Sequence, residues 1–347
     1  MNSKKKLALK VTAVVLAVVL AVLGCFGGYL LYRFNCNKSG STNDYSAVYS
    51  HPVFTFDVGE DGKFDVLKIN DTHFFNGTCE EDKHTLSDIK LVLDNVPCDF
   101  IVVNGDLVEG FTLRSDYDKY QAIDLFAQMI EVYGIPWTFV PGNNDGEIDG
   151  DNEDIIAFMM QYDNFICGNT EGVYGDMQFF VDLTYNGELA HSLAFLDSGM
   201  RKPKAIGKYE YIQESQINWL LDGINDRKVP TSVFFHMPVP SFEDAFDNGE
   251  AYEGFDMYKT YSYIDIPKNQ LFVDMTDGNE YISLISCAHQ HSNNMCSFYN
   301  GRWYQLSSVS GYSAGRDDFI QPSVTLTSID VTAVNAKDMY TFNQVKV

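Results

Sequence analysis

Basic residues are scarce in this chain, which has 24 Lys and Arg against 48 Asp and Glu among its 347 residues. Six of the 24 precede residue 39, where no acid occurs, so the remainder has 18 basic against 48 acidic residues and a net charge of −30. A body this acidic repels nucleic-acid backbones and anionic membrane surfaces. We therefore expect no nucleic-acid partner.

Cysteine pairs of the Cys-x-x-Cys type are also absent, which leaves a zinc ribbon or a thioredoxin-type site unsupported. Seven cysteines occur, and Cys25 falls in an apolar segment near the N-terminus. The other six allow either disulfides or buried free thiols, and their spacing does not decide between the two. With 45% hydrophobic and 14% aromatic residues, the chain can bury a large core.

Long apolar runs are absent except for one, residues 11–32. As a helix this run spans about 33 Å, enough for the apolar core of a bilayer. Lysines are denser before the run than after it, which places the N-terminus in the cytoplasm and the body outside. We therefore predict a basic tip and a signal-anchor transmembrane helix over residues 1–36. The alternative is a cleaved signal peptide and a secreted body. Polar residues then predict a linker over 37–55.

The body, residues 56–347, shows no repeat and no break in composition, so we predict one domain. Strands alternate with helices in its first half. The second half is richer in strands and carries a hairpin signal, Asn186-Gly187. This order predicts an α/β (α+β) fold in which two packed mixed β-sheets are flanked by helices. The expected strands are 64–70, 100–104, 137–140, 178–185, 189–196, 232–235, 281–287 and an edge pair from 323 onward, and the expected helices are 80–96, 117–132 and 213–225.

Five short segments with metal-binding side chains follow apolar runs of this kind. Because ligands collect at the carboxyl ends of strands in open α/β sheets, we expect the five to converge on one rim. Carboxylate and amide oxygens together with imidazoles suit two adjacent ions of the zinc, iron or manganese type. The segments are Asp71-Thr72-His73, Gly105-Asp106, Gly142-Asn143-Asn144-Asp145, His236 and His289-Gln290-His291.

The order Asp-x-His, Gly-Asp, Gly-Asn-x-Asp, His and His-x-His resembles the calcineurin-like metallophosphoesterases over roughly residues 60–315. Within that superfamily, residues 193–199, 215–220, 234–238 and 311–312 are most similar to a branch near the purple acid phosphatases. The resemblance implies a two-sheet sandwich and a dinuclear centre of Mn, Fe or Zn ions, in which a metal-bound hydroxide attacks phosphorus. It also implies the ligands, which are Asp71, His73 and His291 for the first ion, Asn143, His236 and His289 for the second, and Asp106 as the bridge.

Three residues depart from the pattern of that family. Asn144 stands where the family has a histidine near the leaving oxygen, held by the following acid, here Asp145. An amide donates a hydrogen bond but cannot transfer a proton at neutral pH. Glu109 stands where purple enzymes have a metal-binding tyrosine, so a purple colour is not implied. Ala288 replaces a glycine, and its added methyl group is expected to be tolerated.

Three further features lie outside the motifs. Arg316 follows a loop near the expected rim and is a candidate phosphate contact. Residues 242–263, rich in Phe, Tyr, Asp and Glu, could form a wall of the substrate cleft or simply a packed surface loop. His51, His84 and His191 have no motif around them, and we expect surface or structural roles for them.

The leading hypothesis is a membrane-anchored, extracytoplasmic phosphoesterase that depends on two metal ions. Its substrate would be a phosphorylated small molecule or another phosphoester, and phosphomonoesters, nucleotides, cyclic nucleotides and phosphoproteins all remain open. The second hypothesis is a degenerate phosphoesterase, a surface protein that binds metal and ligand with little turnover, and Asn144 is its main support. The third is a purely structural surface protein, which requires no tightly bound metal.

Overall fold

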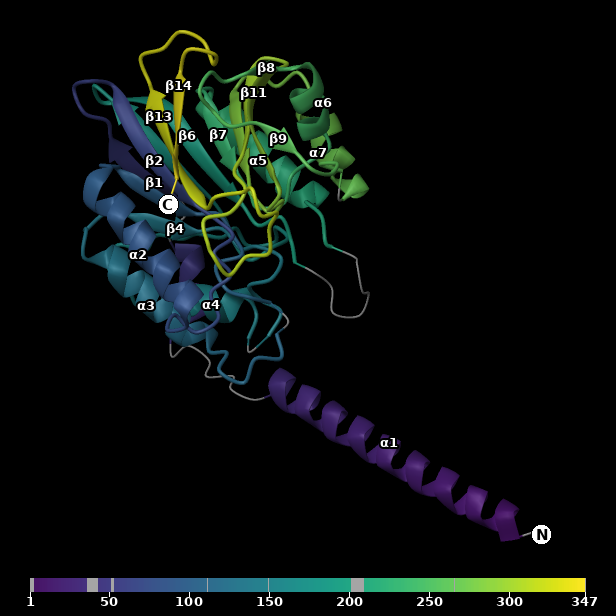
Figure 1. Ribbon diagram of the computed structural model, residues 1–347. Helices are drawn as coiled ribbons and strands as arrows, with labels where there is room; N and C mark the ends of the chain where they lie inside the picture. Colours follow the sequence, from purple (N-terminus) through teal and green to yellow (C-terminus); the bar gives the residue numbers. More distant parts are fainter. Residues whose placement is uncertain are drawn as a thin grey trace.

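The structure, a computed structural model, describes residues 3–35, 43–50, 53–110, 112–148, 150–200, 209–264 and 266–346, and within the first helix the side chains of residues 10–28. Two mixed β-sheets pack together with helices on their outer faces, which is the predicted fold class (Figure 1). The smaller sheet has the order β14 (Tyr340–Lys346), β13 (Ser323–Asp330), β2 (Lys63–Ile69), β3 (Phe100–Val103) and β4 (Trp137–Phe139).

The larger sheet contains the hairpin predicted at Asn186-Gly187, where both residues have positive φ (54° and 82°) as a tight hairpin turn requires. Its order is β1 (Val53–Asp57), β5 (Gln178–Tyr185), β6 (Glu188–Leu196), β7 (Thr231–Phe234), β10 (Ile282–Cys287), β12 (Arg302–Leu306), β11 (Asn293–Tyr299) and β8 (Glu250–Ala251), with β9 (Tyr258–Lys259) paired to β11. It is mixed: the pairs β1-β5, β6-β7, β7-β10 and β10-β12 are parallel, and the pairs β5-β6, β12-β11 and β11-β8 are antiparallel.

Helices cover both outer faces because each has one apolar side. In α3, Ile123, Phe126, Ala127 and Ile130 are buried at helical spacing, and Asp118 caps the first turn by accepting from the Gln121 amide. The helices on the side of the smaller sheet are α2 (Glu80–Asn95), α3 (Lys119–Glu131) and α4 (Asn152–Met159). Those on the larger sheet are α5 (Glu214–Arg227), α6 (Ser241–Asn248) and α7 (Gln270–Thr276), the last preceded by the 3-10 turn η2 (Pro267–Asn269).

Aromatic side chains fill the space between the two sheets. The ring centre of Phe100 in β3 lies 6.0 Å from that of Phe195 in β6 and 5.9 Å from that of Phe56 in β1. Phe195 in turn stacks on Phe179 and Phe234, at 5.0 and 5.3 Å. The smaller sheet is therefore joined to four strands of the larger one, β1, β5, β6 and β7, by continuous apolar contact.

A buried cation also joins the sheets. Lys68 in β2 is 1% exposed, and its Nζ donates to the Ser286 hydroxyl at 3.0 Å, the Cys287 carbonyl at 2.6 Å and Gln305 Oε1 at 2.6 Å. Burial lowers the pKa of Lys68 to about 7. Three acceptors offset the cost of removing this ammonium from water.

The final pair of strands lies at the edge of the smaller sheet, as expected, with β14 outermost and β13 between β14 and β2. Several elements had no prediction because they are short or lack a clear period, and these are β1, β8, β9, β11, β12, α4, α6 and α7.

Six cysteines are free thiols, namely Cys25, Cys79, Cys98, Cys167, Cys287 and Cys296. Cys36 lies outside the described residues.

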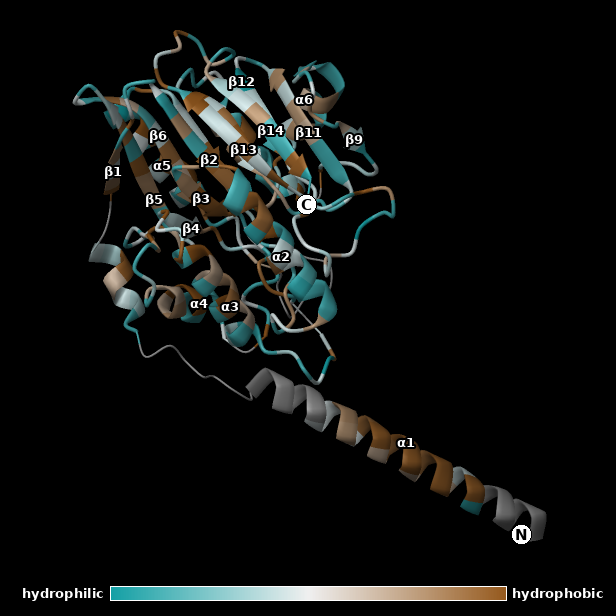
Figure 2. Cartoon of the chain, turned by 60° about the vertical axis from the view of Figure 1, so that its left-hand side comes forward, coloured by the Kyte–Doolittle hydropathy of each residue, from teal (hydrophilic) through white to brown (hydrophobic). Residues whose placement is uncertain are grey.

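The first helix stands apart from the rest in composition. In α1 (Ser3–Asn35), the stretch Lys10–Gly28 has a mean hydropathy of 2.5, and none of it is buried. It is the brown helix in Figure 2. This stretch is long and apolar enough to cross a membrane, as either an anchor or a signal sequence does.

Part of the expected linker packs on the body. Asn43 donates to the Ala157 carbonyl in α4 at 2.6 Å, and the hydroxyl of Tyr45 donates to the carbonyl of Asp176. The 3-10 turn η1 (Tyr45–Ser50) buries Val48 completely. The packed body therefore reaches back to Asn43, N-terminal to the predicted boundary at residue 56.

Candidate metal centre

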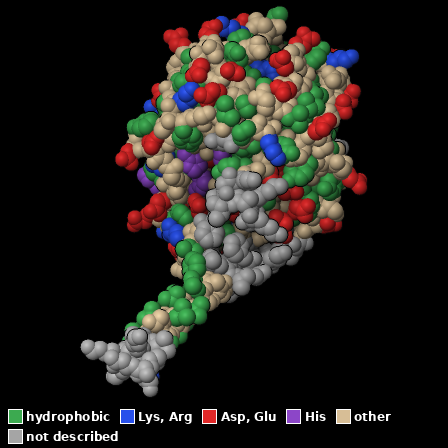
Figure 3. All heavy atoms as spheres, turned by 90° about the vertical axis from the view of Figure 1, so that its right-hand side faces the viewer, with side chains coloured by type: hydrophobic (Ala, Val, Ile, Leu, Met, Phe, Trp, Pro, Cys, Tyr) green, Lys and Arg blue, Asp and Glu red, His purple; other side chains and the backbone are tan. Residues whose placement is uncertain are grey.

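Each predicted segment directly follows a strand. The strands β2, β3 and β4 are parallel neighbours in the smaller sheet, and β7 and β10 are parallel neighbours in the larger one. Their carboxyl ends therefore meet, and the packing of the sheets brings the two sets of loops together. Figure 3 shows histidine side chains gathered in one hollow of the surface.

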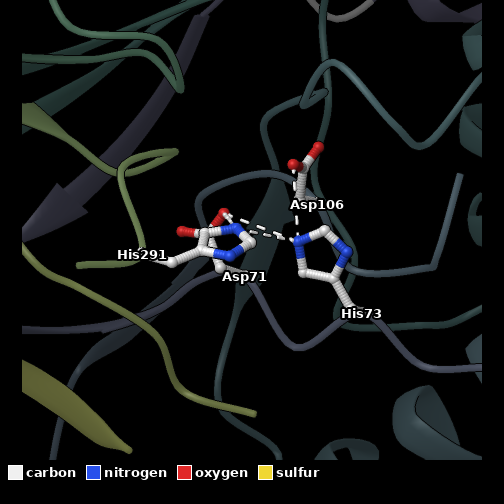
Figure 4. A group of neighbouring side chains, drawn as sticks. All are labelled: Asp71, His73, Asp106 and His291. Atoms are coloured by element: carbon white, nitrogen blue, oxygen red, sulfur yellow. Dashed lines mark hydrogen bonds and ion pairs between the residues drawn. The ribbon is translucent and has the colours of Figure 1, made fainter. Parts of the chain in front are cut away.

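One group of ligand atoms comes from Asp71, His73, Asp106 and His291, all within 4.8 Å of one another. Figure 4 shows these side chains pointing toward a common point. Nε2 of His291 lies 3.3 Å from Oδ1 of Asp71, and Nε2 of His73 lies 3.6 Å from Oδ2 of Asp106. The group can hold a metal ion, since it offers two oxygens and two imidazole nitrogens.

The tautomers of the two histidines favour metal binding. Nδ1 of His73 donates to Oε2 of Glu109 at 3.0 Å, and Nδ1 of His291 donates to the Gly315 carbonyl at 2.6 Å. In the neutral form each ring therefore carries its lone pair at Nε2. The two Nε2 atoms lie only 3.1 Å apart. Two lone pairs at this distance repel each other, so the contact requires a proton on one nitrogen or a metal ion beside both.

A second group comes from Asp106, His236 and His289, again within 4.8 Å. Nε2 of His236 lies 3.3 Å from Oδ2 of Asp106, while its Nδ1 donates to the Asn104 carbonyl at 2.9 Å. Asp106 belongs to both groups. Asn143 lines the same cavity as Asp106 and His289.

Three atoms of these residues are buried without a hydrogen-bond partner, and they are Asp71 Oδ1, Asn143 Oδ1 and His236 Nε2. A buried polar atom without a partner costs about 1–3 kcal/mol, so native proteins rarely keep one. All three atoms are types that coordinate Mn, Fe or Zn ions. The residues present therefore fit a pair of such ions.

The backbone at the site is strained. Seven non-glycine residues have positive φ in the described part of the chain, and four of them are Asp71 (49°), His73 (51°), Asp106 (50°) and His289 (72°). Left-handed backbone is unfavourable for such residues, and it persists where surrounding contacts impose it, commonly at functional sites.

Two glycines allow the loops to approach each other closely. A Cβ on Gly105 would lie 2.3 Å from Nδ1 of His236, and one on Gly142 would lie 2.2 Å from the amide nitrogen of Asp106. Both distances are far inside van der Waals contact. Glycine at these positions therefore permits the three loops to meet.

Asn144 faces Asp106. Its backbone amide donates to Oδ1 of Asp106 at 2.8 Å, and its side-chain Nδ2 donates to Oδ2 at 2.7 Å. Asp145 is buried and accepts from the amides of Asp106 (2.9 Å), Val108 (3.1 Å) and Gly142 (2.8 Å). Although the family histidine is missing, Asp145 does not stand without partners, and it ties the loops after β3 and β4 together.

Burial and neighbouring charges shift the pKa values of the site residues in both directions. Burial lowers the pKa of His73, but the Glu109 bond and the charges of Asp106 and Asp71 outweigh it and raise the pKa to about 9. Burial also lowers the pKa of His236, but the charge of Asp106 outweighs burial and raises this pKa to about 9. Burial and the neighbouring His236 lower the pKa of His289 to about 3. Burial and the charge of Asp106 raise the pKa of Asp145 to about 6.

Asp82, fully buried in the first turn of α2, fastens two loops of the site. Its Oδ2 accepts from three successive amides of the loop after His73, at 2.9, 2.9 and 2.8 Å (Phe75, Asn76 and Gly77). Its Oδ1 accepts from the Ser313 hydroxyl at 2.8 Å. Ser313 precedes Gly315, the partner of His291. One carboxylate thus anchors the segments that carry or orient His73 and His291.

The centre opens into a cavity of about 490 Å³ that includes Asn144, Tyr209, Tyr261 and Arg316 in its lining. Tyr261 lies in the aromatic segment considered as a wall of the cleft. Arg316 lies at the cavity, where we expected it, and its Nε donates to the Ile320 carbonyl at 3.1 Å.

The remaining histidines have other contacts. His84 stacks on Tyr312, with 3.9 Å between ring centres. His191 is buried beside the Ser232 hydroxyl, 2.9 Å from its Nε2. His51 lies outside the described residues.

A family model described as calcineurin-like phosphoesterase matches residues 64–293, and the chain belongs to this family. The probable inactive purple acid phosphatase 14 of Arabidopsis thaliana is 27% identical over 74% of this chain and 74% of the relative. Phosphatase DCR2 of Saccharomyces cerevisiae is 25% identical over 73% of this chain and 49% of the relative. The resemblance to this family, in a branch near the purple acid phosphatases, is confirmed.

Among solved structures, a dimetal phosphatase from Danio rerio matches with a TM-score of 0.53, over 82% of this chain and 98% of that chain, at 11% identity. At this identity the match shows a shared fold.

Sequence reasoning missed the roles of Glu109, Asp82 and Tyr209. The position of Glu109, three residues after Asp106, was a usable signal, because a residue at that spacing reaches the same site. Asp82 and Tyr209 carry no local pattern, and only the packing of distant loops brings them to the centre.

Proposed function

We propose that this protein hydrolyses phosphate esters with the help of two metal ions of the Mn, Fe or Zn type. The observation that carries the proposal is the convergence of seven oxygen- and nitrogen-bearing side chains, three of which present buried atoms without a hydrogen-bond partner. The first ion would be held by Asp71, His73 and His291, and the second by Asn143, His236 and His289, with Asp106 between them.

When bound, such ions activate a water molecule and neutralise charge on the phosphate oxygens. The residues of the chain hold this arrangement in place. Glu109, Asn104 and Gly315 fix three histidine tautomers with Nε2 toward the centre. Arg316 would contact a phosphate oxygen at the cavity wall. Asn144 would orient Asp106 through its two hydrogen bonds rather than transfer a proton.

A second candidate is a degenerate phosphoesterase that binds metal and ligand with little turnover. Asn144 favours it, because the side chain has no titratable proton near neutral pH. The name of the Arabidopsis relative, a probable inactive purple acid phosphatase, is consistent with it. The complete set of metal-binding side chains argues for turnover.

Hydrolysis of an aryl phosphate by the purified full chain, with and without added Mn²⁺, separates the two candidates. Asp106→Asn should abolish hydrolysis and reduce the bound metal from two ions toward none, because Asp106 lies in both groups. Asp94→Asn, on the exposed side of α2, is the matched control. Wild-type protein that contains no metal after growth with Mn, Fe and Zn would contradict the site itself.

We also propose that α1 anchors the protein in a membrane, with the body, which includes the packed residues 43–50, outside the cytoplasm. An apolar helix rather than charge would hold the protein, so a high-salt wash should leave it with the membrane fraction. Added protease should reach the body in intact cells. Recovery of soluble protein lacking the first 36 residues would show a cleaved signal instead.

A further inference from the structure

The cavity above the candidate metal centre is larger than a phosphate group needs. Its volume of about 490 Å³ lies within the range of organic-ligand sites, roughly 300–1,000 Å³. Asp106, Asn143, Asn144, His289 and His291 line it on the side of the metal centre. The other lining residues would face the organic part of an ester, and they are Tyr209, Tyr261, Ser292, Gly315 and Arg316.

Two of these residues are tyrosines in defined positions. The Tyr209 ring stands edge-on to His289, with 5.3 Å between ring centres and an interplanar angle of 87°. A group esterified to a phosphate at the centre therefore lies beside Tyr209. Tyr261 is 41% exposed, and its backbone is fixed by Asn293, whose Nδ2 donates to the Tyr261 carbonyl at 2.8 Å.

Arg316 supplies positive charge at this cavity. It is the one Lys or Arg among the described residues that line the cavity. Its guanidinium lies 5.4 Å above the Tyr312 ring, and it also donates to carbonyls of its own loop, at 3.3 Å for Ala314. The chain as a whole carries a net charge of −24. A single phosphate can be matched at this site, whereas additional anionic groups would meet an acidic surface.

Resting on the proposed phosphoesterase function, we infer that the cavity selects monoesters that combine a single phosphate with a planar aromatic group stacked on Tyr209 and Tyr261. Nucleoside 5′-monophosphates and phenolic phosphates belong to this class. Hydrolysis breaks the ester P–O bond, water supplies hydroxide to phosphorus, and the leaving oxygen takes up the proton. Stacking on tyrosine is sequence-tolerant for nucleobases, because every base has a π-face.

The test compares AMP with ribose 5-phosphate, which share the leaving oxygen and differ in the base. For the full chain in detergent with Mn²⁺, kcat/KM for AMP should exceed that for ribose 5-phosphate by about tenfold. Tyr261→Leu should reduce kcat/KM about tenfold more for AMP than for ribose 5-phosphate. Tyr261→Phe keeps the ring and should preserve the ratio. Tyr209→Leu should act in the same direction as Tyr261→Leu.

Calorimetry with the same two ligands keeps this inference separate from the proposed function. Tighter binding of AMP without hydrolysis of either ligand would support aromatic recognition and contradict the phosphoesterase proposal. Two results would overturn the aromatic recognition and leave the phosphoesterase proposal standing. One is hydrolysis of AMP and ribose 5-phosphate at equal kcat/KM. The other is an equal loss of kcat/KM for the two ligands in Tyr261→Leu. ADP adds a second phosphate and should bind more weakly than AMP. Tighter binding of ADP would overturn the single-phosphate requirement.

Discussion

Oε2 of Glu109 lies 3.0 Å from Nδ1 of His73 and fixes that imidazole with Nε2 toward the candidate metal centre. The side chain of Glu109 is 25% exposed, whereas that of His73 is 5% exposed. A carboxylate in this position raises the basicity of a metal-binding imidazole and sets its tautomer. The residue at the place of the tyrosine of purple enzymes thus orients a residue that could hold a metal ion.

Glu109→Gln keeps an acceptor for His73 but removes the negative charge. We expect Mn²⁺ to bind about 10- to 100-fold more weakly, because partners of this kind contribute that much to metal affinity. Competition with a chelating dye measures the Kd. Glu214→Gln, an exposed change on α5, should leave the Kd as in wild type. If the Kd of Glu109→Gln equals that of the wild type, the charge of Glu109 has no part in metal binding.

Asp82→Asn should loosen the loops that position His73 and His291. The amide keeps its size but loses the charge that accepts from four donors. We expect one of the two ions to be lost on dialysis, while the ion near His236 is retained. Elemental analysis measures the content, and circular dichroism confirms the fold. Loss of both ions in parallel with unfolding would reduce Asp82 to a general stabilising role.

Asn144→His restores the side chain typical of the family. A general acid contributes about 10²–10⁴-fold, chiefly where the leaving group is poor. We therefore expect slow turnover of alkyl esters in wild type, and a larger gain for alkyl than for aryl esters in the variant, with Asp145 orienting the new imidazole. Rates are measured with metal content held equal. Equal or reduced rates for both ester classes would count against a missing acid.

His191 predicts a pH dependence of stability away from the metal centre. Burial lowers its pKa to about 3, so it is neutral in the folded body and has a pKa near 6.5 when unfolded. The unfolded state then binds the extra proton, and stability falls as the pH drops from 6.5 toward 3, by up to about 1.4 kcal/mol per unit. Relative to wild type, His191→Gln should lose about 2 kcal/mol less between pH 7 and pH 5. Urea unfolding at the two values measures the difference, and parallel losses would exclude the histidine as the cause.

The strand ends of this site could be predicted because their signals are local. An apolar run such as 100–103 followed by Asp106 is readable without any knowledge of packing, and the same holds for His289 and His291 after β10. Partners that act through tertiary contact could not be predicted. Asp82 and Ser313 are 231 residues apart. The carbonyls of Asn104 and Gly315 have no sequence signature, because every residue has one.

The buried ammonium of Lys68 has a consequence for how the two sheets align during folding. Lys68 lies three residues before Asp71 on β2, and its acceptor Cys287 lies two residues before His289 at the end of β10. Sliding one sheet past the other by a single residue would leave this buried amino group without its acceptors, at a cost of about 1–3 kcal/mol. Misaligned packings are thereby penalised, and the ligands from the two sheets reach the same height only in the native alignment.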